Sequence, residues 1–314
     1  MLGSTEGLNR LLVRTALSVD IGSFKFGRGV MKKNSLLLLP VAALLLAGAS
    51  TVLHQGQEEQ KIVLAELFTG SECPPCVAVD LAFEELLKEY PSSQVAVLEY
   101  HLHIPMPDPM TNADSEGRAE YYNAQSTPTV FVDGRSVGGG GGPAEYAQRR
   151  FNTINSAVKR ARRDDPVVGI QLNASRNDNV VNISVDAELI GDPGRLRNLY
   201  LRIALAEKML DYTGNNGISA HQMVVRKMIG GPQGQPLNLA DENYTGEFEI
   251  DLNEVEADLL TFTNDFEGRF RGRYGWNGFS AKLDKIDPSN LVVVAFVQAE
   301  RGNQVLQARV VELK

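Results

Sequence analysis

The spacing of apolar positions along the chain changes near residue 166. Upstream of that point, short continuous apolar runs alternate with segments of helical period, which is the pattern of strands buried between helices. The run Ile62–Phe68 predicts the first such strand, and the amphipathic segment Val77–Tyr90 predicts the helix after it. Further elements expected before residue 166 are a strand over Gln94–Tyr100, a helix over Ser115–Tyr122, a strand from Thr129 to the Asp133-Gly134 turn, and a helix over Ala144–Arg163.

Downstream of Pro166 the apolar period becomes two, which is typical of half-buried strands. Seven or so strands at this spacing favour a β-sandwich. We therefore expect an α/β domain over residues 61–163 and an all-β sandwich domain over residues 167–314, with one helix over Val255–Phe266. The expected strands begin near Val168 and Val181 and then cover Leu199–Glu207, Gln222–Ile229, Thr245–Leu252, Leu291–Ala299 and Gln304–Glu312.

Two irregular segments accompany these elements. The five glycines Gly138–Gly142 lack the Gly-Lys-Ser/Thr ending of a phosphate loop, so they predict a flexible joint before the next helix. The loop after the C-terminal helix is rich in aromatic residues, which favours a small satellite core, with a partner-binding surface as the alternative. Its aromatic residues are Phe270, Tyr274, Trp276 and Phe279.

The N-terminal 49 residues predict an extension that carries a secretory signal over residues 31–49. Lys32 and Lys33 form a basic start, Leu36–Leu46 is an apolar stretch, and cleavage is expected after Ala49. Because this signal is complete from Met31, we expect the natural start there, with a long basic leader as the alternative. Residues 50–60 are a polar tether. The protein is thus expected to be exported, periplasmic or extracellular, unless an uncleaved signal tethers it to the membrane.

The charge balance narrows the class of partner. The chain has 31 basic and 39 acidic residues, a formal net charge of −8, and no basic stripe interleaved with aromatic residues. This composition argues against a nucleic-acid partner.

The only two cysteines form the motif Cys73-Pro74-Pro75-Cys76 between the first strand and its helix. At a helix N-terminus, orphan N–H groups and the helix dipole favour a thiolate, which is the reactive form of cysteine. Cys73 is therefore the expected attacking thiol and Cys76 the resolving one. A zinc site would need a second pair of ligands, and an inert staple across so short a loop would stabilise little.

Residues 61–163 resemble a thioredoxin-superfamily domain. The resemblance rests on the CPPC motif at a strand-to-helix turn and on Thr127-Pro128, about fifty residues later, before a strand that ends in Asp-Gly. The chain lacks the Trp-Cys-Gly-Pro-Cys motif of thioredoxins. It is more similar to exported bacterial proteins that open with an "ELFTG…C" strand, have a β-rich C-terminal domain and are related to an outer-membrane-protein family.

This resemblance implies roles for three further residues. The proline at the position of Pro128 is cis in that family and lies against the cysteines, and the residue before it, here Thr127, aligns an extended substrate segment. Glu66 resembles the buried acid of thioredoxins, although it is one residue further from the CxxC. It is therefore a candidate proton acceptor for Cys76, with a salt-bridged or strand-edge glutamate as the alternative.

The sequence thus predicts an exported thiol-disulfide oxidoreductase that acts on protein disulfides or dithiols and is recycled by a redox partner. Its redox-active disulfide needs no organic cofactor, and no metal is expected. Copper delivery through His101 and His103 with the two cysteines is a minor alternative. The main alternative is an envelope binding or assembly module, whose C-terminal domain engages a partner while the thioredoxin-like part is a vestigial scaffold.

Overall fold

A computed structural model of the protein describes residues 60–192, 194, 197–240 and 243–313. The predicted N-terminal extension (1–49), its signal (31–49), the expected start at Met31 and most of the tether (50–60) lie outside these residues. Within the described ranges, no helix is long and apolar enough to cross a membrane.

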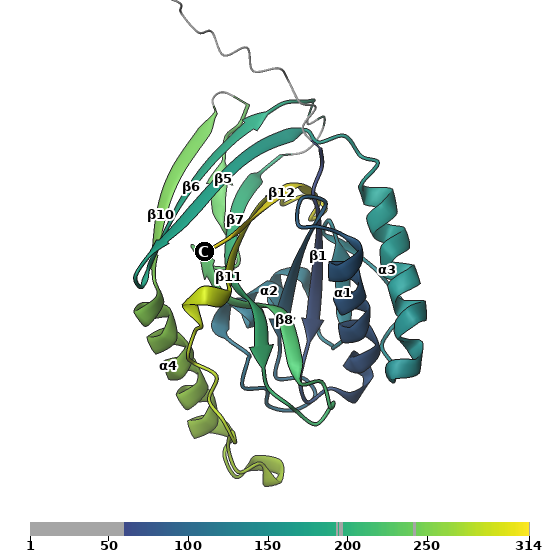
Figure 1. The fold of residues 1–314 in the computed structure, drawn as a ribbon, viewed down its shortest axis with the longest axis vertical. Coiled ribbons are helices and arrows are strands. Elements are labelled where there is room, and N and C mark those ends of the chain that lie inside the picture. The colour runs from purple at the N-terminus through teal and green to yellow at the C-terminus, as the bar shows by residue number, and fades with distance from the viewer. Residues whose placement is uncertain (1–59, 193, 195–196, 241–242, 314) are drawn as a thin grey trace, which may run out of the picture. The chain divides into compact units, whose positions relative to one another are not determined.

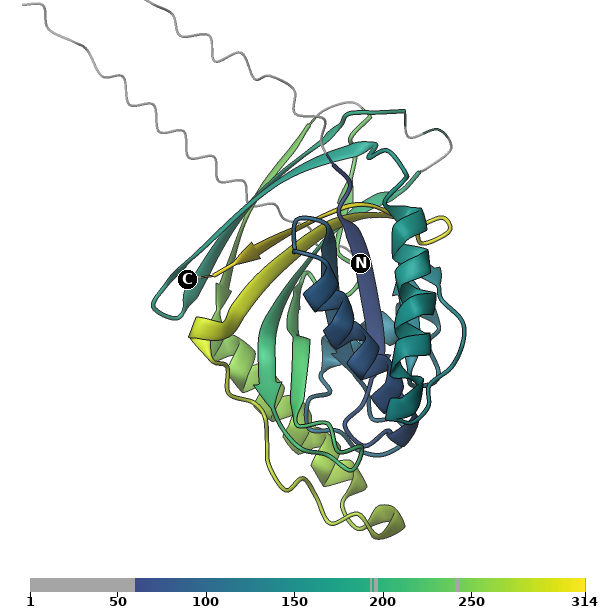
Figure 2. The same ribbon diagram turned by 45° about the vertical axis from the view of Figure 1, so that its right-hand side comes forward.

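The first elements follow the order predicted for residues 61–163. Strands β1 and β2 are parallel and buried along their whole length, because α1 and α3 lie over one face and α2 over the other (Figure 1, Figure 2). The elements are β1 (Val63–Thr69), the 3-10 turn η1 (Pro74–Cys76), α1 (Val77–Glu89), β2 (Val95–His101), α2 (Ala113–Tyr122), β3 (Thr129–Val132), β4 (Arg135–Ser136), η2 (Ala144–Tyr146) and α3 (Ala147–Ala161).

The remaining elements include all seven predicted strands. The helix predicted over residues 255–266 is longer than expected, because the Asp251 side chain caps it by accepting a hydrogen bond from the Asn253 backbone N–H. The elements are β5 (Val168–Asn177), β6 (Val180–Leu189), β7 (Leu199–Asp211), β8 (Ala220–Ile229), β9 (Gln235–Leu237), β10 (Tyr244–Asp251), α4 (Leu252–Phe270), η3 (Arg273–Gly275), η4 (Pro288–Asn290), β11 (Leu291–Ala299) and β12 (Val305–Glu312).

One large sheet contains strands from both sides of residue 166. Its nine strands run in the order β12-β11-β7-β8-β2-β1-β3-β4, with β9 beside β7. The two halves join where Glu99 of β2 pairs with Val224 of β8. The protein is therefore mixed α/β with a large β-sheet. The division into domains over 61–163 and 167–314 stays a prediction.

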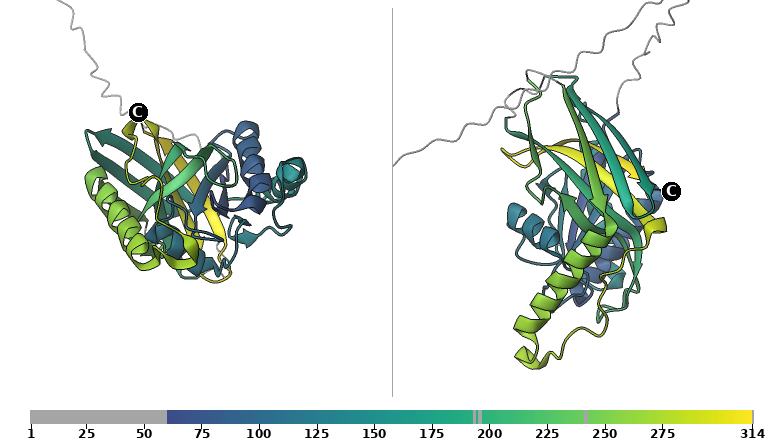
Figure 3. Two further views of the ribbon diagram at one scale, coloured as in Figure 1. Left: turned by 90° about the horizontal axis from the view of Figure 1, so that it is seen from below. Right: turned by 90° about the vertical axis from the view of Figure 1, so that its left-hand side faces the viewer.

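A second sheet covers part of the first. Strands β10, β6 and β5 form it (Figure 3). Their inward side chains share an apolar core with β7 and β11. The exposed positions of β10 alternate with half-buried ones, as expected for a strand with one face in water. This half of the protein is β-rich, as the sequence predicts.

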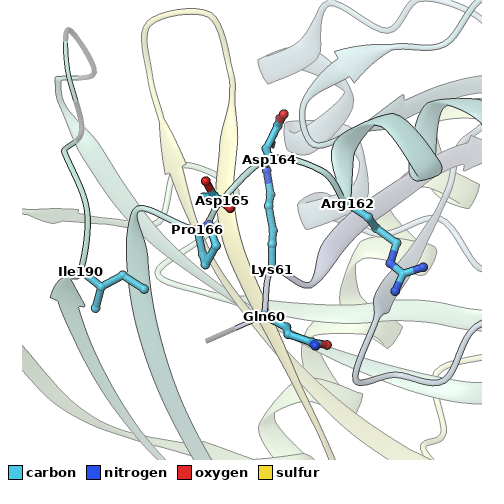
Figure 4. A pocket seen from close by; sticks show the side chains of 7 residues that line it. All are labelled: Gln60, Lys61, Arg162, Asp164, Asp165, Pro166 and Ile190. Carbon is cyan, nitrogen blue, oxygen red and sulfur yellow. Dashed lines mark ion pairs between the residues drawn. The ribbon is translucent and has the colours of Figure 1, made fainter. Parts of the chain in front are cut away.

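A polar pocket of about 510 Å³ opens at the N-terminal end of β1 (Figure 4). Lys61 lies in it and forms an ion pair with Asp133 at 2.9 Å, while Asp164 is 3.9 Å away. Because Lys61 precedes β1 and the cysteines follow that strand, this pocket is roughly 20 Å from the CPPC motif. The lining residues are Gln60, Lys61, Arg162, Asp164, Asp165, Pro166 and Ile190.

Candidate redox site

The two cysteines lie where β1 leads into α1. The strand ends at Thr69, a turn over residues 70–72 follows, and Cys73 precedes the single 3-10 turn that enters the helix. Cys73 and Cys76 form a disulfide, with an S–S distance of 2.08 Å and a Cα separation of 5.3 Å. Both residues are fully buried. The helix N-terminus would stabilise a thiolate on Cys73 after reduction.

Thr127 lies against Cys73 of this disulfide, and Pro128 follows it in the chain. The Thr127–Pro128 peptide bond is cis. The Thr127 Oγ1 atom is 3.3 Å from Cys73 Sγ and 2.9 Å from the Ile104 carbonyl oxygen. A hydroxyl has one hydrogen, so it donates to one of these acceptors at a time. The structure therefore brings together Cys73, Cys76, Thr127 and Pro128, four of the five site residues named from the sequence.

Glu66 has a different environment. Its carboxylate accepts hydrogen bonds from Arg118 Nε at 2.9 Å, Tyr122 Oη at 2.6 Å and Tyr100 Oη at 3.1 Å. Arg118 and Tyr122 belong to α2. Thr69, three positions after Glu66 on the same strand, points to the opposite face and bonds to α1. Glu66 thus points away from the helix that carries Cys76, and its contacts are those of the salt-bridged alternative.

Asp80 is the buried acid on the helix of the cysteines. It follows Cys76 by four residues, so the two side chains are neighbours on one face of the helix. Its Oδ1 accepts a hydrogen bond from Thr69 Oγ1 at 2.6 Å, whereas Oδ2 is buried without a hydrogen-bond partner among the described residues. Burial raises the pKa of Asp80 to about 7. A carboxyl with this pKa exchanges its proton near neutral pH.

A small crevice leads to Asp80 from the side of the sheet. Its volume of about 20 Å³ is enough for one water molecule. Asp80, Glu99 and His221 line it together with residues of the β7–β8 connection. Burial, followed by the nearby Asp80 carboxyl, raises the pKa of Glu99 well above its usual range. Burial also lowers the pKa of His221 to about 4. A water here would face three carboxyls, those of Asp80, Glu84 and Glu99, and a neutral imidazole.

The turn that presents Cys73 is held from two sides. Asp108 Oδ2 accepts a hydrogen bond from the Ser71 backbone N–H at 2.6 Å and lies 2.8 Å from His101 Nδ1. Although burial opposes it, the His101 imidazole helps to hold the pKa of Asp108 below its usual value. From the β7–β8 connection, the Asn216 N–H donates to the Ser71 carbonyl at 3.0 Å. The C-terminal half therefore contributes directly to the turn that precedes Cys73.

The two histidines of the copper alternative both contact Asp108, but their rings pack against different neighbours. His101 packs against His221, with ring centroids 4.9 Å apart, while His103 stacks on Phe266 at 3.6 Å. Phe279 and Trp276 join Phe266 in the same aromatic cluster, as the satellite-core prediction expects, whereas Tyr274 is exposed. In the described part of the chain, no group of three or more His, Cys, Asp or Glu side chains is arranged to hold a metal ion.

The sequence assigns no role to Asp80, Asp108 or His221. Asp80 carries a local signal, because it shares a helix face with Cys76 and with the buried Phe83. Asp108 and His221 carry none. Asp108 reaches the site from the proline-rich segment after β2, and His221 reaches it from β8, more than a hundred residues later. No periodicity in the sequence predicts either approach.

Comparisons with known proteins show similarity of structure. No family model and no curated protein sequence matches the chain. HBP35 of Porphyromonas gingivalis has a TM-score of 0.52 at 16% identity, over 81% of this chain and 76% of that one. Protein AGR_C_4864 from Agrobacterium tumefaciens covers 81% of this chain and 95% of its own at 13% identity, with a TM-score of 0.45.

A third solved structure is a domain of the outer membrane lipoprotein Omp28 from Porphyromonas gingivalis. It is 15% identical and covers 48% of this chain and 91% of its own, with a TM-score of 0.27. Of these three similarities, only that to HBP35 is strong enough to indicate a shared fold.

Proposed function

We propose that the protein is a thiol-disulfide oxidoreductase that acts on protein disulfides or dithiols, built on a thioredoxin-like domain over residues 61–163. The observation that carries this proposal is the Cys73–Cys76 disulfide at the entrance to α1, with Thr127 Oγ1 3.3 Å from Cys73 Sγ. The CPPC pair and the Thr127-Pro128 segment are adjacent although fifty residues of sequence separate them. This adjacency is what recognition and exchange at one sulfur require.

In the reducing direction, the Cys73 thiolate attacks one sulfur of a substrate disulfide. That S–S bond breaks, a bond between Cys73 and the substrate sulfur forms, and the second substrate sulfur leaves as a thiolate that takes a proton. The Thr127 hydroxyl can turn from the Ile104 carbonyl to the Cys73 sulfur, where its hydrogen stabilises the negative charge.

The second step closes the Cys73–Cys76 bond. Asp80 accepts the proton of the Cys76 thiol, and the resulting thiolate attacks Cys73 Sγ, releasing the remaining substrate sulfur as a thiolate. The substrate has then gained two electrons and the chain has lost two. A redox partner restores the dithiol, and the reverse sequence of steps oxidises a substrate dithiol. Asp80 rather than Glu66 takes the proton in this scheme, because Glu66 is paired with Arg118.

Replacing Asp80 with Asn is expected to slow closure of the pair on the order of a hundredfold at pH 7. Asn cannot accept the Cys76 proton, so the rise in rate near pH 7 should also disappear. The measurement is stopped-flow oxidation of the reduced protein by a small disulfide between pH 5 and 9.

Glu84→Gln is the matched control, because Glu84 lines the same crevice but is only half-buried. A second readout is unfolding by urea. The folded state holds the Asp80 proton more tightly than the unfolded state does, so this contribution to stability is complete below pH 3.8 and is lost as the pH rises through about 7. The Asn variant should therefore gain stability relative to the native protein over that range. A rate profile identical to that of the native protein would remove Asp80 from the mechanism.

The proposal includes an exported location, supported by the predicted signal over residues 31–49. An envelope protein that docks on the β-rich C-terminal half is the partner we would seek first. One observation favours the alternative of a binding or assembly module with vestigial redox chemistry, namely that both cysteines are fully buried.

Incubation of the oxidised protein in glutathione buffers of graded ratio tests the proposal. A redox-active pair takes up and loses two electrons reversibly, whereas a vestigial pair stays oxidised while the protein is folded.

A further inference from the structure

The glycine segment Gly138–Gly142 lies on the CPPC motif. Its last residue forms two main-chain hydrogen bonds there. The Gly142 N–H donates to the Pro75 carbonyl oxygen at 2.7 Å, and the Gly142 carbonyl accepts from the Ala78 N–H at 3.0 Å. Ala78 lies in the first turn of α1, where backbone N–H groups have no partner within the helix. The segment, called the glycine strap below, thus satisfies a donor and an acceptor beside the disulfide.

The strap also fills the space between the CPPC motif and Pro128. A Cβ atom added to Gly141 would lie 1.9 Å from the Pro75 carbonyl oxygen and 2.9 Å from Pro128 Cδ. No side chain fits at such distances, so the Gly141 main chain packs directly against Pro75 and Pro128. Pro75 lies between the two cysteines, and Pro128 follows Thr127, whose Oγ1 is 3.3 Å from Cys73 Sγ, so the strap lies beside the disulfide.

The other end of the strap is held by α3. Both Nη atoms of Arg150 donate to the Gly138 carbonyl oxygen at 3.2 Å. Between the two attachments, Gly140 has open space around it. The sequence predicts a flexible joint here, but the contacts show a segment that is hydrogen-bonded at both ends.

We propose that the glycine strap occupies, with its own main chain, the groove in which an extended substrate segment docks, and that the redox site opens when the strap moves off. This inference rests on the proposed function. It assigns the groove to an extended polypeptide segment with a glycine or another small residue beside its reactive sulfur. Such a segment would use the Pro75 carbonyl and the Ala78 N–H that Gly142 now uses.

Thiol-disulfide exchange also requires that the attacking sulfur can reach Cys73, so it too predicts that the strap moves. An attacking sulfur must approach Cys73 Sγ in line with the bond that breaks. Cys73 and Cys76 have 0% exposure. A small reductant needs only a brief opening, whereas a protein partner needs the strap to vacate the groove. Displacement of the strap should therefore speed exchange with a protein more than reduction by a small molecule.

Gly141→Ala tests this inference directly. The added methyl group clashes with Pro75 and pushes the strap out, and the backbone of Gly141 is outside the left-handed region, so alanine adds no conformational strain. Gly138→Ala is the matched control, because a Cβ there meets nothing within 4 Å. Rates are measured for reduction by a water-soluble phosphine and for exchange with a reduced protein dithiol. We expect about a tenfold gain with the protein dithiol for Gly141→Ala, as for a shift of a minor open state, and no gain for Gly138→Ala.

Equal rates for the native protein and Gly141→Ala, or a slower variant with unchanged thermal stability, would overturn the inference. If Gly141→Ala does not fold, Arg150→Gln releases the other end of the strap and must give the same acceleration. If the proposed function is wrong, the two measured rates give a different result. The protein would then exchange with no protein dithiol, while Gly141→Ala would still speed reduction by the phosphine.

Discussion

Replacing Cys73 with Ser is expected to abolish exchange with protein disulfides, and replacing Cys76 with Ser is expected to stop it halfway. Without Cys73 no sulfur lies at the helix entrance to attack the substrate. Without Cys76 the mixed disulfide between Cys73 and the substrate cannot be resolved and accumulates. The measurement is non-reducing electrophoresis with mass analysis after the reduced protein has been mixed with a disulfide-bonded protein.

The two serine variants are expected to differ, because Cys76→Ser accumulates the mixed disulfide and Cys73→Ser cannot form it. Thr127→Val keeps the shape of the side chain near Cys73 but removes the hydroxyl, so it should weaken the first step without preventing the trapped complex from forming. Equal trapping by the two serine variants would contradict the assignment of Cys73 as the attacking thiol.

The second large effect concerns stability. Replacing Arg118 with Met is expected to destabilise the protein by about 3–5 kcal/mol, because it leaves the Glu66 carboxylate buried without its cation. Arg118 and Glu66 are both fully buried, and Arg118 also donates to Tyr122 Oη at 3.0 Å and to Gln298 Oε1 at 2.9 Å. Gln298 lies on β11, so the cluster ties the α/β half to the C-terminal half. Urea unfolding gives the difference.

Lys88→Met is the control for this prediction, since Lys88 makes an exposed ion pair with Glu84 and its loss should leave the unfolding midpoint unchanged. The double variant Glu66→Gln with Arg118→Met should recover part of the lost stability, because it removes the unpaired charge. Arg118→Met with native stability would mean that the buried pair contributes nothing to the fold.

The strands and helices were predictable because their patterns are local. The apolar runs at β1 and β2 and the two-residue period after residue 166 each follow from burial on two faces or one. The union of both halves in one sheet was not predictable. It depends on the pairing of Glu99 with Val224, which are 125 positions apart and carry no special sequence signal.

At the candidate site, the motifs predicted which residues lie together, which the spacing of apolar positions could not. The adjacency of Thr127 and Cys73 followed from the resemblance to a known domain, not from periodicity. Glu66 differs in its surroundings from the acid that the resemblance implies, because strand side chains alternate and a one-residue shift places a side chain on the other face of the sheet. Asp80 lies on the face of Cys76, where helical spacing gives a clear expectation.

Equilibration of the native protein with glutathione measures whether the Cys73–Cys76 pair is redox-active. After acid quenching, mass spectrometry counts the reduced and oxidised forms at each ratio of reduced to oxidised glutathione. We expect one reversible two-electron transition, with a potential between about −270 and −120 mV as in other CxxC proteins. A pair that stays oxidised across the whole series in the folded protein, yet is reduced in urea, would rule out redox activity of the native fold and favour the binding module.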